Sequence, residues 1–186
     1  MLLLVGLGNP TPNSQNNRHN IGFKIVDAIN QKFGLSKQKP KFKGLLTTGN
    51  IGDKKIYAIK PLTFMNNSGI CIRELLEYFK IDAEDVIVFH DDLDIEFGKI
   101  KAKFGGSSAG HNGIASIDKF IGKEYSRVRI GIGKPENKIS VSDYVLNDFS
   151  EDEQVHLDSM TSNIIESLTI LIDKKLDLFS STVNNN

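Results

Sequence analysis

The apolar residues of this chain fall into short blocks that follow two different periods. Residues 2–7 form a nearly continuous apolar run, which is typical of a buried strand. Ile21, Ile25 and Ile29 then recur every four residues, which is the spacing of an amphipathic helix. Gly34 stands where a glycine commonly ends such a helix. The pattern therefore predicts a strand followed directly by a helix.

The same periods continue along the rest of the chain. Residues 44–51 and 54–59 flank Gly52 and Asp53, a pair that favours a two-residue hairpin turn. Residues 86–89 are all apolar, as in a strand that is covered on both faces. The other predicted elements are a helix that begins near residues 66–68, an alternating strand over 95–104, a helix over 112–121, a strand over 127–133 and a long final helix from about residue 150.

This order of elements predicts the fold class. Strands that alternate with helices, together with one hairpin, indicate a three-layer α/β/α domain around a mixed, mostly parallel twisted sheet. Residues 1–179 are expected to form this single domain, since no linker or repeat interrupts them. Residues 180–186 are polar and are expected to be a disordered tail.

Composition narrows the class of protein further. Charged residues make up 25% of the 186 positions, an ordinary value for a globular protein. No apolar run approaches the roughly 18 residues of a membrane-spanning helix, and the first strand lacks the features of a signal peptide. Cys71 is the single cysteine, so no internal disulfide can form, which fits a reducing compartment. We therefore expect a cytoplasmic protein without membrane contact.

The net charge is zero, but the basic residues are unevenly placed. Lysines occupy positions 37, 39, 41 and 43, and again 99, 101 and 103. In a strand, the last three would share one face. They could protect the edge of a sheet from other strands, or they could bind phosphates. Spacing alone favours the first interpretation.

A glycine-containing loop follows the first predicted strand. The sequence Gly6-Leu7-Gly8-Asn9-Pro10 does not fit a dinucleotide-binding loop, because Thr11 stands where that motif needs glycine. A polar segment then leads to His19, just before the first helix. This is the carboxyl end of a strand, where α/β proteins keep their sites.

His19 and Asp91 are candidates for an acid–base pair. No G-x-S-x-G motif is present, so a serine nucleophile lacks its usual signature. A histidine can instead activate water, provided that a carboxylate orients its ring. Asp91 follows the buried strand over 86–89 and would lie near the end of the first strand if the two are neighbours. From the residues alone, His19 could equally be a loop residue at the start of a helix.

A metal site is the main chemical alternative. The sequence Asp92-x-Asp94-x-Glu96 begins like a calcium-binding loop, but Phe97 replaces the glycine that the turn requires. We therefore expect no bound metal and no cofactor. His90 and His111 are expected to anchor loops or to lie in the core.

Five blocks of the sequence together resemble the bacterial-type peptidyl-tRNA hydrolases. The resemblance extends from about residue 2 to residue 150, with the blocks in the order of that family. It implies an esterase that cleaves the bond between a peptide and the 3′ ribose of tRNA, acting as a monomer without a protein partner. The blocks are Gly6-Leu7-Gly8-Asn9-Pro10 with Arg18-His19-Asn20, Thr63-Phe64-Met65-Asn66-Asn67-Ser68-Gly69, His90-Asp91-Asp92-Leu93-Asp94, Gly105-Gly106-Ser107-Ser108-Ala109-Gly110-His111-Asn112-Gly113, and Arg127-Val128-Arg129-Ile130-Gly131-Ile132-Gly133.

The resemblance also implies roles for individual residues. His19 would be the general base and Asp91 its orienting carboxylate. Asn9 would help to reject substrates that carry a free amino group, and residues 105–110 would form a mobile lid. The remaining implied contacts are Phe64, Asn66 and Asn112 with the substrate, and Lys103 and Arg129 with a tRNA phosphate.

Two departures from the family pattern concern the loop before His19. Thr11 and Pro12 stand where the family usually has a glycine turn, and Ser14 replaces a tyrosine that contacts substrate. The site prediction includes Ser14 as the residue at this substrate-binding position. Two other functions remain open, namely an RNA-binding relative without catalysis and a metal-dependent phosphoesterase.

Overall fold

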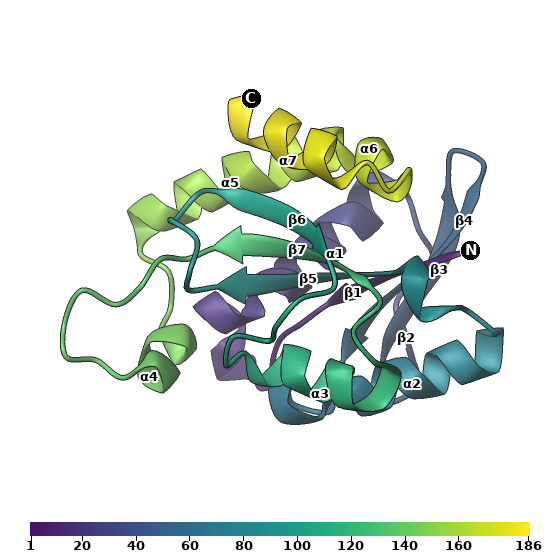
Figure 1. Ribbon diagram of the computed structural model, residues 1–186, viewed down its shortest axis with the longest axis horizontal. Helices are drawn as coiled ribbons and strands as arrows, with labels where there is room; N and C mark the ends of the chain where they lie inside the picture. Colours follow the sequence, from purple (N-terminus) through teal and green to yellow (C-terminus); the bar gives the residue numbers. More distant parts are fainter.

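A seven-stranded sheet lies between two layers of helices (Figure 1). The computed structural model describes residues 1–186. The strands are ordered β2-β3-β4-β1-β5-β7-β6 across the sheet. Their bounds are β1 Leu2–Gly6, β2 Lys39–Lys41, β3 Gly44–Ile51, β4 Lys54–Pro61, β5 Val86–Asp92, β6 Ile100–Phe104 and β7 Ser126–Gly131. The helices are α1 Ile21–Lys32, α2 Ser68–Phe79, α3 Asn112–Ile121, α4 Val141–Leu146, α5 Glu151–Glu166, α6 Leu168–Ile172 and α7 Leu176–Asn185, and short 3₁₀ turns include η2 Arg18–Asn20 and η3 Met65–Asn67.

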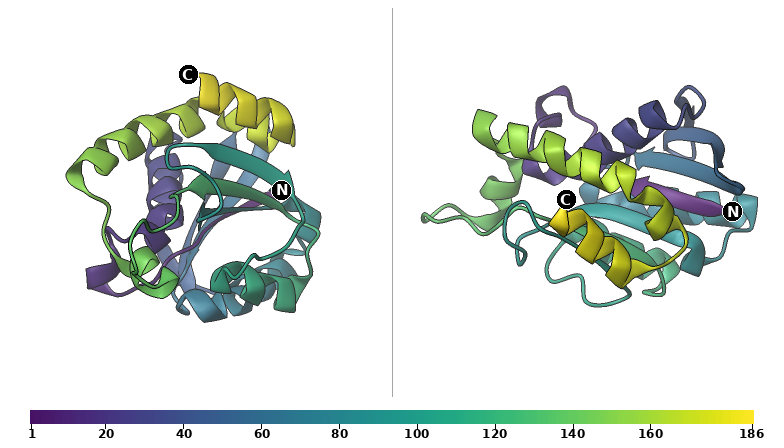
Figure 2. Two further views of the ribbon diagram at one scale, coloured as in Figure 1. Left: turned by 60° about the vertical axis from the view of Figure 1, so that its left-hand side comes forward. Right: turned by 90° about the horizontal axis from the view of Figure 1, so that it is seen from above.

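The first strand is apolar throughout because each of its faces is covered. Leu2 and Leu4 belong to a core cluster shared with α1, α5, α6 and α7. Leu3 and Val5 belong to a second cluster, shared with α2 and α3. Figure 2 shows these two helical layers on opposite sides of the sheet. The three-layer α/β/α arrangement predicted from the sequence is confirmed.

Parallel pairing is confined to the centre of the sheet. β1 pairs in parallel with β4 and β5, and β5 pairs in parallel with β7. β2, β3 and β6 are joined by antiparallel pairing. The sheet is therefore mixed, as predicted, but with a smaller parallel share than expected. The carboxyl ends of β1, β4, β5 and β7 meet at one edge, and the candidate site lies there.

The carboxyl-terminal region differs most from the prediction. The long helix expected from residue 150 is divided into α5, α6 and α7, with Ser167 at the first break. Residues 180–185 belong to α7 and are not a disordered tail. Ser180 Oγ accepts a hydrogen bond from the backbone N–H of Ala102, and Asn184 exchanges two hydrogen bonds with the backbone of Ile100. These polar side chains therefore satisfy the free edge of β6.

Two short elements were not predicted. β2 contains lysines of the basic run at 37–43 and forms the opposite edge of the sheet, where Pro40 is tolerated. α4 follows β7 and lies beside the candidate site. None of the helices combines the length and the apolar character that a membrane-spanning helix requires.

Candidate active site

The loop after β1 is fixed by close packing of α1 against the ends of β1 and β5. A Cβ atom on Gly22 would lie 2.4 Å from the backbone nitrogen of Leu7 and 2.4 Å from the carbonyl oxygen of Phe89. Only glycine permits this approach, which brings the η2 turn over the sheet edge. Asn20 then exchanges two hydrogen bonds of 2.9 Å with the backbone of Asn9. His19 is therefore held on a doubly anchored turn.

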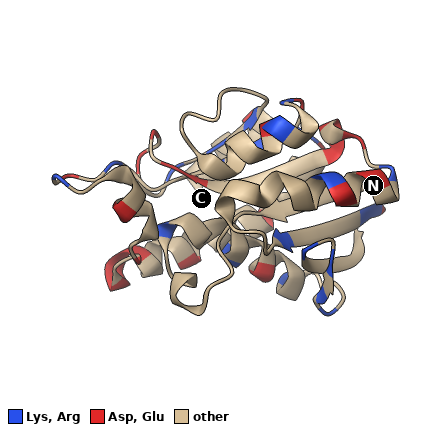
Figure 3. Ribbon diagram, turned by 90° about the horizontal axis from the view of Figure 1, so that it is seen from below, with Lys and Arg blue, Asp and Glu red and all other residues tan.

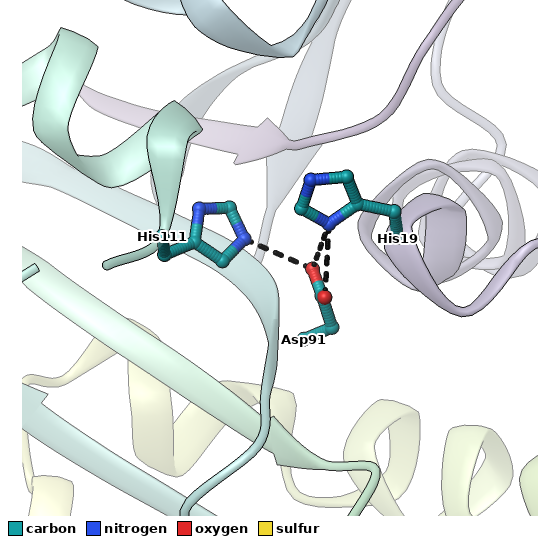
Figure 4. A group of neighbouring side chains, drawn as sticks. All are labelled: His19, Asp91 and His111. Carbon is teal, nitrogen blue, oxygen red and sulfur yellow. Dashed lines mark hydrogen bonds and ion pairs between the residues drawn. The ribbon is translucent and has the colours of Figure 1, made fainter. Parts of the chain in front are cut away.

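His19 and His111 both contact the carboxylate of Asp91 at the end of β5 (Figure 4). Nδ1 of His19 lies 2.9 Å and 3.0 Å from the two carboxylate oxygens. Nε2 of His111 lies 2.9 Å from one of them. All three side chains are 90% or more buried. The predicted His19–Asp91 pair is thus brought together, with a second histidine on the same carboxylate.

The hydrogen bonds define which nitrogens carry protons. Nδ1 of His111 accepts from the backbone N–H groups of Gly113 and Ile114, so its Nε2 donates to Asp91. An ionised carboxylate only accepts, so Nδ1 of His19 also donates. The Nε2 atom of His19 has no protein partner and faces the cleft. It presents a lone pair, as a general base requires.

Electrostatics keep Asp91 charged and His90 neutral. Burial alone would raise the pKa of the Asp91 carboxyl, but His111 and His19 outweigh it and hold that pKa well below its usual range. Burial, and then the proximity of His111, lower the pKa of His90 to about 3. His90 donates through Nδ1 to the carbonyl oxygen of Asp91 at 2.8 Å. His90 and His111 thus anchor the site, as the sequence predicted.

A cleft of about 850 Å³ opens over this centre. It contains Asn9, Asn66 and Asn112 in its lining, as well as Phe64. Oδ1 of Asn9 accepts a 2.9 Å hydrogen bond from the backbone N–H of Met65, which leaves its Nδ2 available. The side chains of Asn66 and Asn112 make no hydrogen bond within the protein. The predicted asparagines therefore converge on the cleft of His19 with unused hydrogen-bonding groups.

Phe64 occupies an unusual backbone conformation at the mouth of the cleft. Its φ is +64° and its ψ is 157°, a region that is essentially restricted to glycine. Phe64 is 52% exposed. The strained backbone turns the chain from β4 into η3, so that the N–H of Met65 reaches Asn9.

Basic residues face one another across β6 and β7. The strand register places Lys103 opposite Arg127 and Lys101 opposite Arg129. Like charges in such positions repel. Arg129 lines the cleft and pairs with Asp92 at 2.8 Å, whereas Lys103 is exposed beyond it. Figure 3 shows both signs of charge over the molecule, as the zero net charge requires, so this basic face is a local feature.

Ser14, like Lys103, is a predicted site residue that the structure does not bring into the cleft. It is buried, and its hydroxyl hydrogen-bonds with Thr11 within the loop 11–17. Of the segment 105–110 that was predicted as a lid, residues 107–110 line the cleft. It is also anchored, because Nη1 of Arg127 donates to the carbonyl oxygen of Ser107 at 2.8 Å.

His19, Asp91 and His111 are also the group that could hold a metal ion. Their ligand atoms lie within 4.8 Å of one another. These atoms are already joined by hydrogen bonds, and a metal would have to displace protons from both donating nitrogens. The first carboxylate of the calcium-like segment over residues 92–96 already has partners, because Asp92 accepts hydrogen bonds from Arg129 and from the backbone N–H of Asp94. The arrangement therefore favours proton transfer over metal binding.

Two residues of the site were not predicted. Asn20 fixes the backbone of Asn9. Its position next to His19 in the sequence could have indicated this role. The sequence indicated His111 only as an anchor, because its contact with Asp91 depends on the fold.

Comparison with known proteins gives consistent results. The family model described as "Peptidyl-tRNA hydrolase" matches residues 3–186. A peptidyl-tRNA hydrolase of Pelagibacter ubique is 82% identical over 185 residues and covers 100% of both chains. That of Ehrlichia canis is 45% identical and covers 98% of this chain and 94% of its own. A crystal structure of peptidyl-tRNA hydrolase from Acinetobacter baumannii superposes with a TM-score of 0.92 at 34% identity, covering 99% of this chain and 94% of that one.

Proposed function

Because this chain belongs to the peptidyl-tRNA hydrolase family, we propose that it cleaves peptidyl-tRNA with a water molecule that His19 activates. The activity itself, which releases tRNA for reuse, is that of the family. The proposal concerns the residues that perform it. It rests chiefly on one observation: Asp91 engages Nδ1 of His19 and leaves Nε2 open to the cleft.

The reaction proceeds through two proton transfers at the same nitrogen. Nε2 of His19 takes a proton from water as the water oxygen attacks the ester carbonyl carbon. When the tetrahedral intermediate collapses, the bond from that carbon to the ribose 3′ oxygen breaks, and His19 returns the proton to this oxygen. Asp91 stabilises the imidazolium that exists between the two transfers. The products are a free peptide carboxyl group and tRNA.

The three asparagines position the substrate and the developing oxyanion. Amide N–H groups directed into the cleft can donate to a peptide carbonyl or to the oxyanion. Asn9 offers its Nδ2 donor to the cleft, because its Oδ1 is turned toward the backbone N–H of Met65. A donor cannot bind a free ammonium group, which supports a role for Asn9 in selecting blocked substrates. Phe64 at the cleft mouth would contact the substrate.

Lys103 and Arg129 bind a phosphate of the tRNA in this proposal. The support is that each of them faces another cation across β6 and β7, since Lys103 lies opposite Arg127 and Arg129 lies opposite Lys101. A bound anion would relieve this repulsion. Ser14 contributes no substrate contact, since it lies outside the cleft. We also propose that the enzyme acts as a cytoplasmic monomer without metal or cofactor. The hydrogen bonds that already join His19, Asp91 and His111 support a mechanism without metal.

One experiment tests the proposal against its alternatives. Wild-type protein and His19→Ala are incubated with N-acetylaminoacyl-tRNA, with and without EDTA. We expect hydrolysis by the wild type in both conditions and a loss of ~10²–10⁴ in kcat for the variant. Inhibition by EDTA would favour the metal-dependent mechanism. Near-normal turnover by His19→Ala would exclude His19 as the base.

A further inference from the structure

The Arg18 side chain connects the turn of His19 to the helices beyond the cleft. Arg18 directly precedes His19 in η2. Its Nη1 lies 3.3 Å from the carbonyl oxygen of Tyr144 and 3.4 Å from that of Asn147. Its Nη2 lies 3.1 Å from the carboxylate of Glu153. One guanidinium thus binds the end of α4 and the first turn of α5.

Aromatic packing encloses the same guanidinium. Its central carbon lies 4.3 Å from the centre of the Tyr144 ring and 5.6 Å from that of Phe149. The side chain is only 12% exposed. A planar fork that both stacks and donates to several acceptors is particular to arginine, because a lysine ammonium cannot reproduce this geometry.

The position of α4 depends on these contacts. This helix has six residues, which is too few to be stable alone. Arg18 supplies a cation and side-chain donors at its carboxyl end, in addition to the backbone N–H groups that the carbonyl oxygens of Tyr144 and Asn147 accept. The backbone reinforces the link, because the N–H of Arg18 donates to Asn147 and Asn17 bridges to Asp148.

α4 forms an apolar wall of the cleft. Val141, Val145 and Leu146 line it there, with Leu93 beside them. The two arginines of the cleft, Arg127 and Arg129, lie instead on β7, and Lys134, between β7 and α4, is paired with Asp94. Since tRNA is attracted to the basic side, the apolar wall remains for the peptide.

We propose that Arg18 is a positioning residue that fixes the α4 wall relative to His19. Given the proposed function of His19, this sets the distance between a bound peptide and the base. A longer peptide covers more of the wall, so the importance of Arg18 grows with peptide length.

The test compares two substrates, an N-acetylaminoacyl-tRNA and a tRNA that carries a peptide of several residues. Arg18→Met keeps an unbranched side chain that can pack against Tyr144 and Phe149, but it removes the charge and every side-chain donor. We expect kcat on the longer substrate to fall about tenfold, and kcat on the shorter one to change about threefold or less, because small misplacements of reacting groups are costly. Arg18→Lys should lie between the wild type and Arg18→Met.

Lys24→Met is the matched control. Lys24 donates to Gln154 at 3.0 Å in the first turn of α5, next to Glu153, and is partly buried. Its bond reaches neither η2 nor α4. We expect this variant to keep the wild-type ratio of kcat values on the two substrates.

An unchanged ratio in Arg18→Met would overturn the proposal, even if the melting temperature falls. If that variant does not fold, Arg18→Lys and Glu153→Gln decide the question by the same ratio. Failure of the proposed function is distinguishable, because it would appear as turnover by His19→Ala on both substrates, whatever the length of the peptide.

Discussion

The centre around Asp91 and the remaining walls of the cleft differ in their hydrogen-bond partners. The groups of the centre bond to other groups of the protein, whereas polar side chains of the walls are free to bond to substrate. His19, Asp91 and His111 are joined by bonds within the protein, and backbone groups fix the last of them. Asn66 and Asn112 line the same cleft without a protein partner for their side chains. The first region is organised before substrate arrives, whereas the second is completed by substrate. Changes in the first should lower kcat, and changes in the second should alter binding and selectivity.

The largest effect should come from Asp91→Asn. An asparagine oxygen can accept from one histidine only, and its amide would face the other. His111 cannot change tautomer, because Gly113 and Ile114 require its Nδ1 as an acceptor. His19 would therefore accept through Nδ1 and carry its proton on Nε2, where it cannot act as a base. We expect kcat to fall by ~10²–10⁴ with KM within a few-fold, measured on N-acetylaminoacyl-tRNA.

The same variant has a predicted pH signature in stability. The pKa of Asp91 is lowered by folding, so its stabilising effect is present above the pKa of an unfolded aspartate and is lost as pH falls through the folded value. The difference in unfolding free energy between wild type and Asp91→Asn should therefore shrink in acid. A difference that is constant from neutral to acid pH would contradict a preorganised charge at Asp91.

The contrast between the two regions also explains what sequence could predict. The carboxyl edge of the sheet was predictable because residues 2–7 and 86–89 are apolar on both faces, as in buried strands. That the two strands are neighbours, and so bring His19 and Asp91 together, is known only from the fold. α3 was predicted with its observed bounds, Asn112–Ile121, from its isoleucine spacing. Such local periodicity carries its own signal, and so does the cluster of family motifs.

Contacts between distant segments had no such signal. Ser180 and Asn184 are polar and suggest disorder, because their partners are backbone groups of β6 some 80 residues earlier. The sequence indicated that His111 anchors a loop, but not that it bonds to Asp91. Nothing in the sequence indicated that Arg18 bonds to the end of α4. Ser14 was expected in the cleft from its position in the loop relative to Asn9. That position does not reveal the direction in which the loop turns its side chains, and Ser14 is buried against Thr11.

Asn9 belongs to both regions, and a substitution there should separate them. Asn9→Asp keeps an oxygen for the N–H of Met65 but presents a second, charged oxygen to the cleft. That oxygen would attract the ammonium of an unblocked aminoacyl-tRNA. We expect the ratio of kcat/KM for blocked over free substrate to fall about tenfold, as one or two kcal/mol of new attraction would give. Equal changes for both substrates would limit Asn9 to a structural role.

A smaller, salt-dependent effect is expected on the basic face. Lys103→Ala should raise KM for full-length tRNA and reduce the slope of log KM against log salt by about 0.7–0.9, the value for one phosphate contact. Lys55→Ala is the control, because Lys55 is exposed at the opposite end of β4. Arg129→Ala should have a larger effect on KM, since it also leaves Asp92 without its partner. Slopes identical to the control would remove Lys103 from the tRNA surface.

The smallest effect concerns Phe64, a residue of the cleft wall whose backbone conformation is strained. Its φ of +64° costs roughly 1–3 kcal/mol for a residue other than glycine. Phe64→Gly and Phe64→Ala both remove the exposed ring, but only glycine relieves the strain. The two variants should lose the same activity through higher KM, while Phe64→Gly should exceed Phe64→Ala in unfolding free energy by about 1 kcal/mol, after allowance for the greater chain entropy of glycine. Denaturant titration measures this difference. A different outcome would be that the two variants are equally stable and Phe64→Gly loses more activity. In that case the strained conformation itself positions Met65 against Asn9, and this wall of the cleft is as preorganised as the centre.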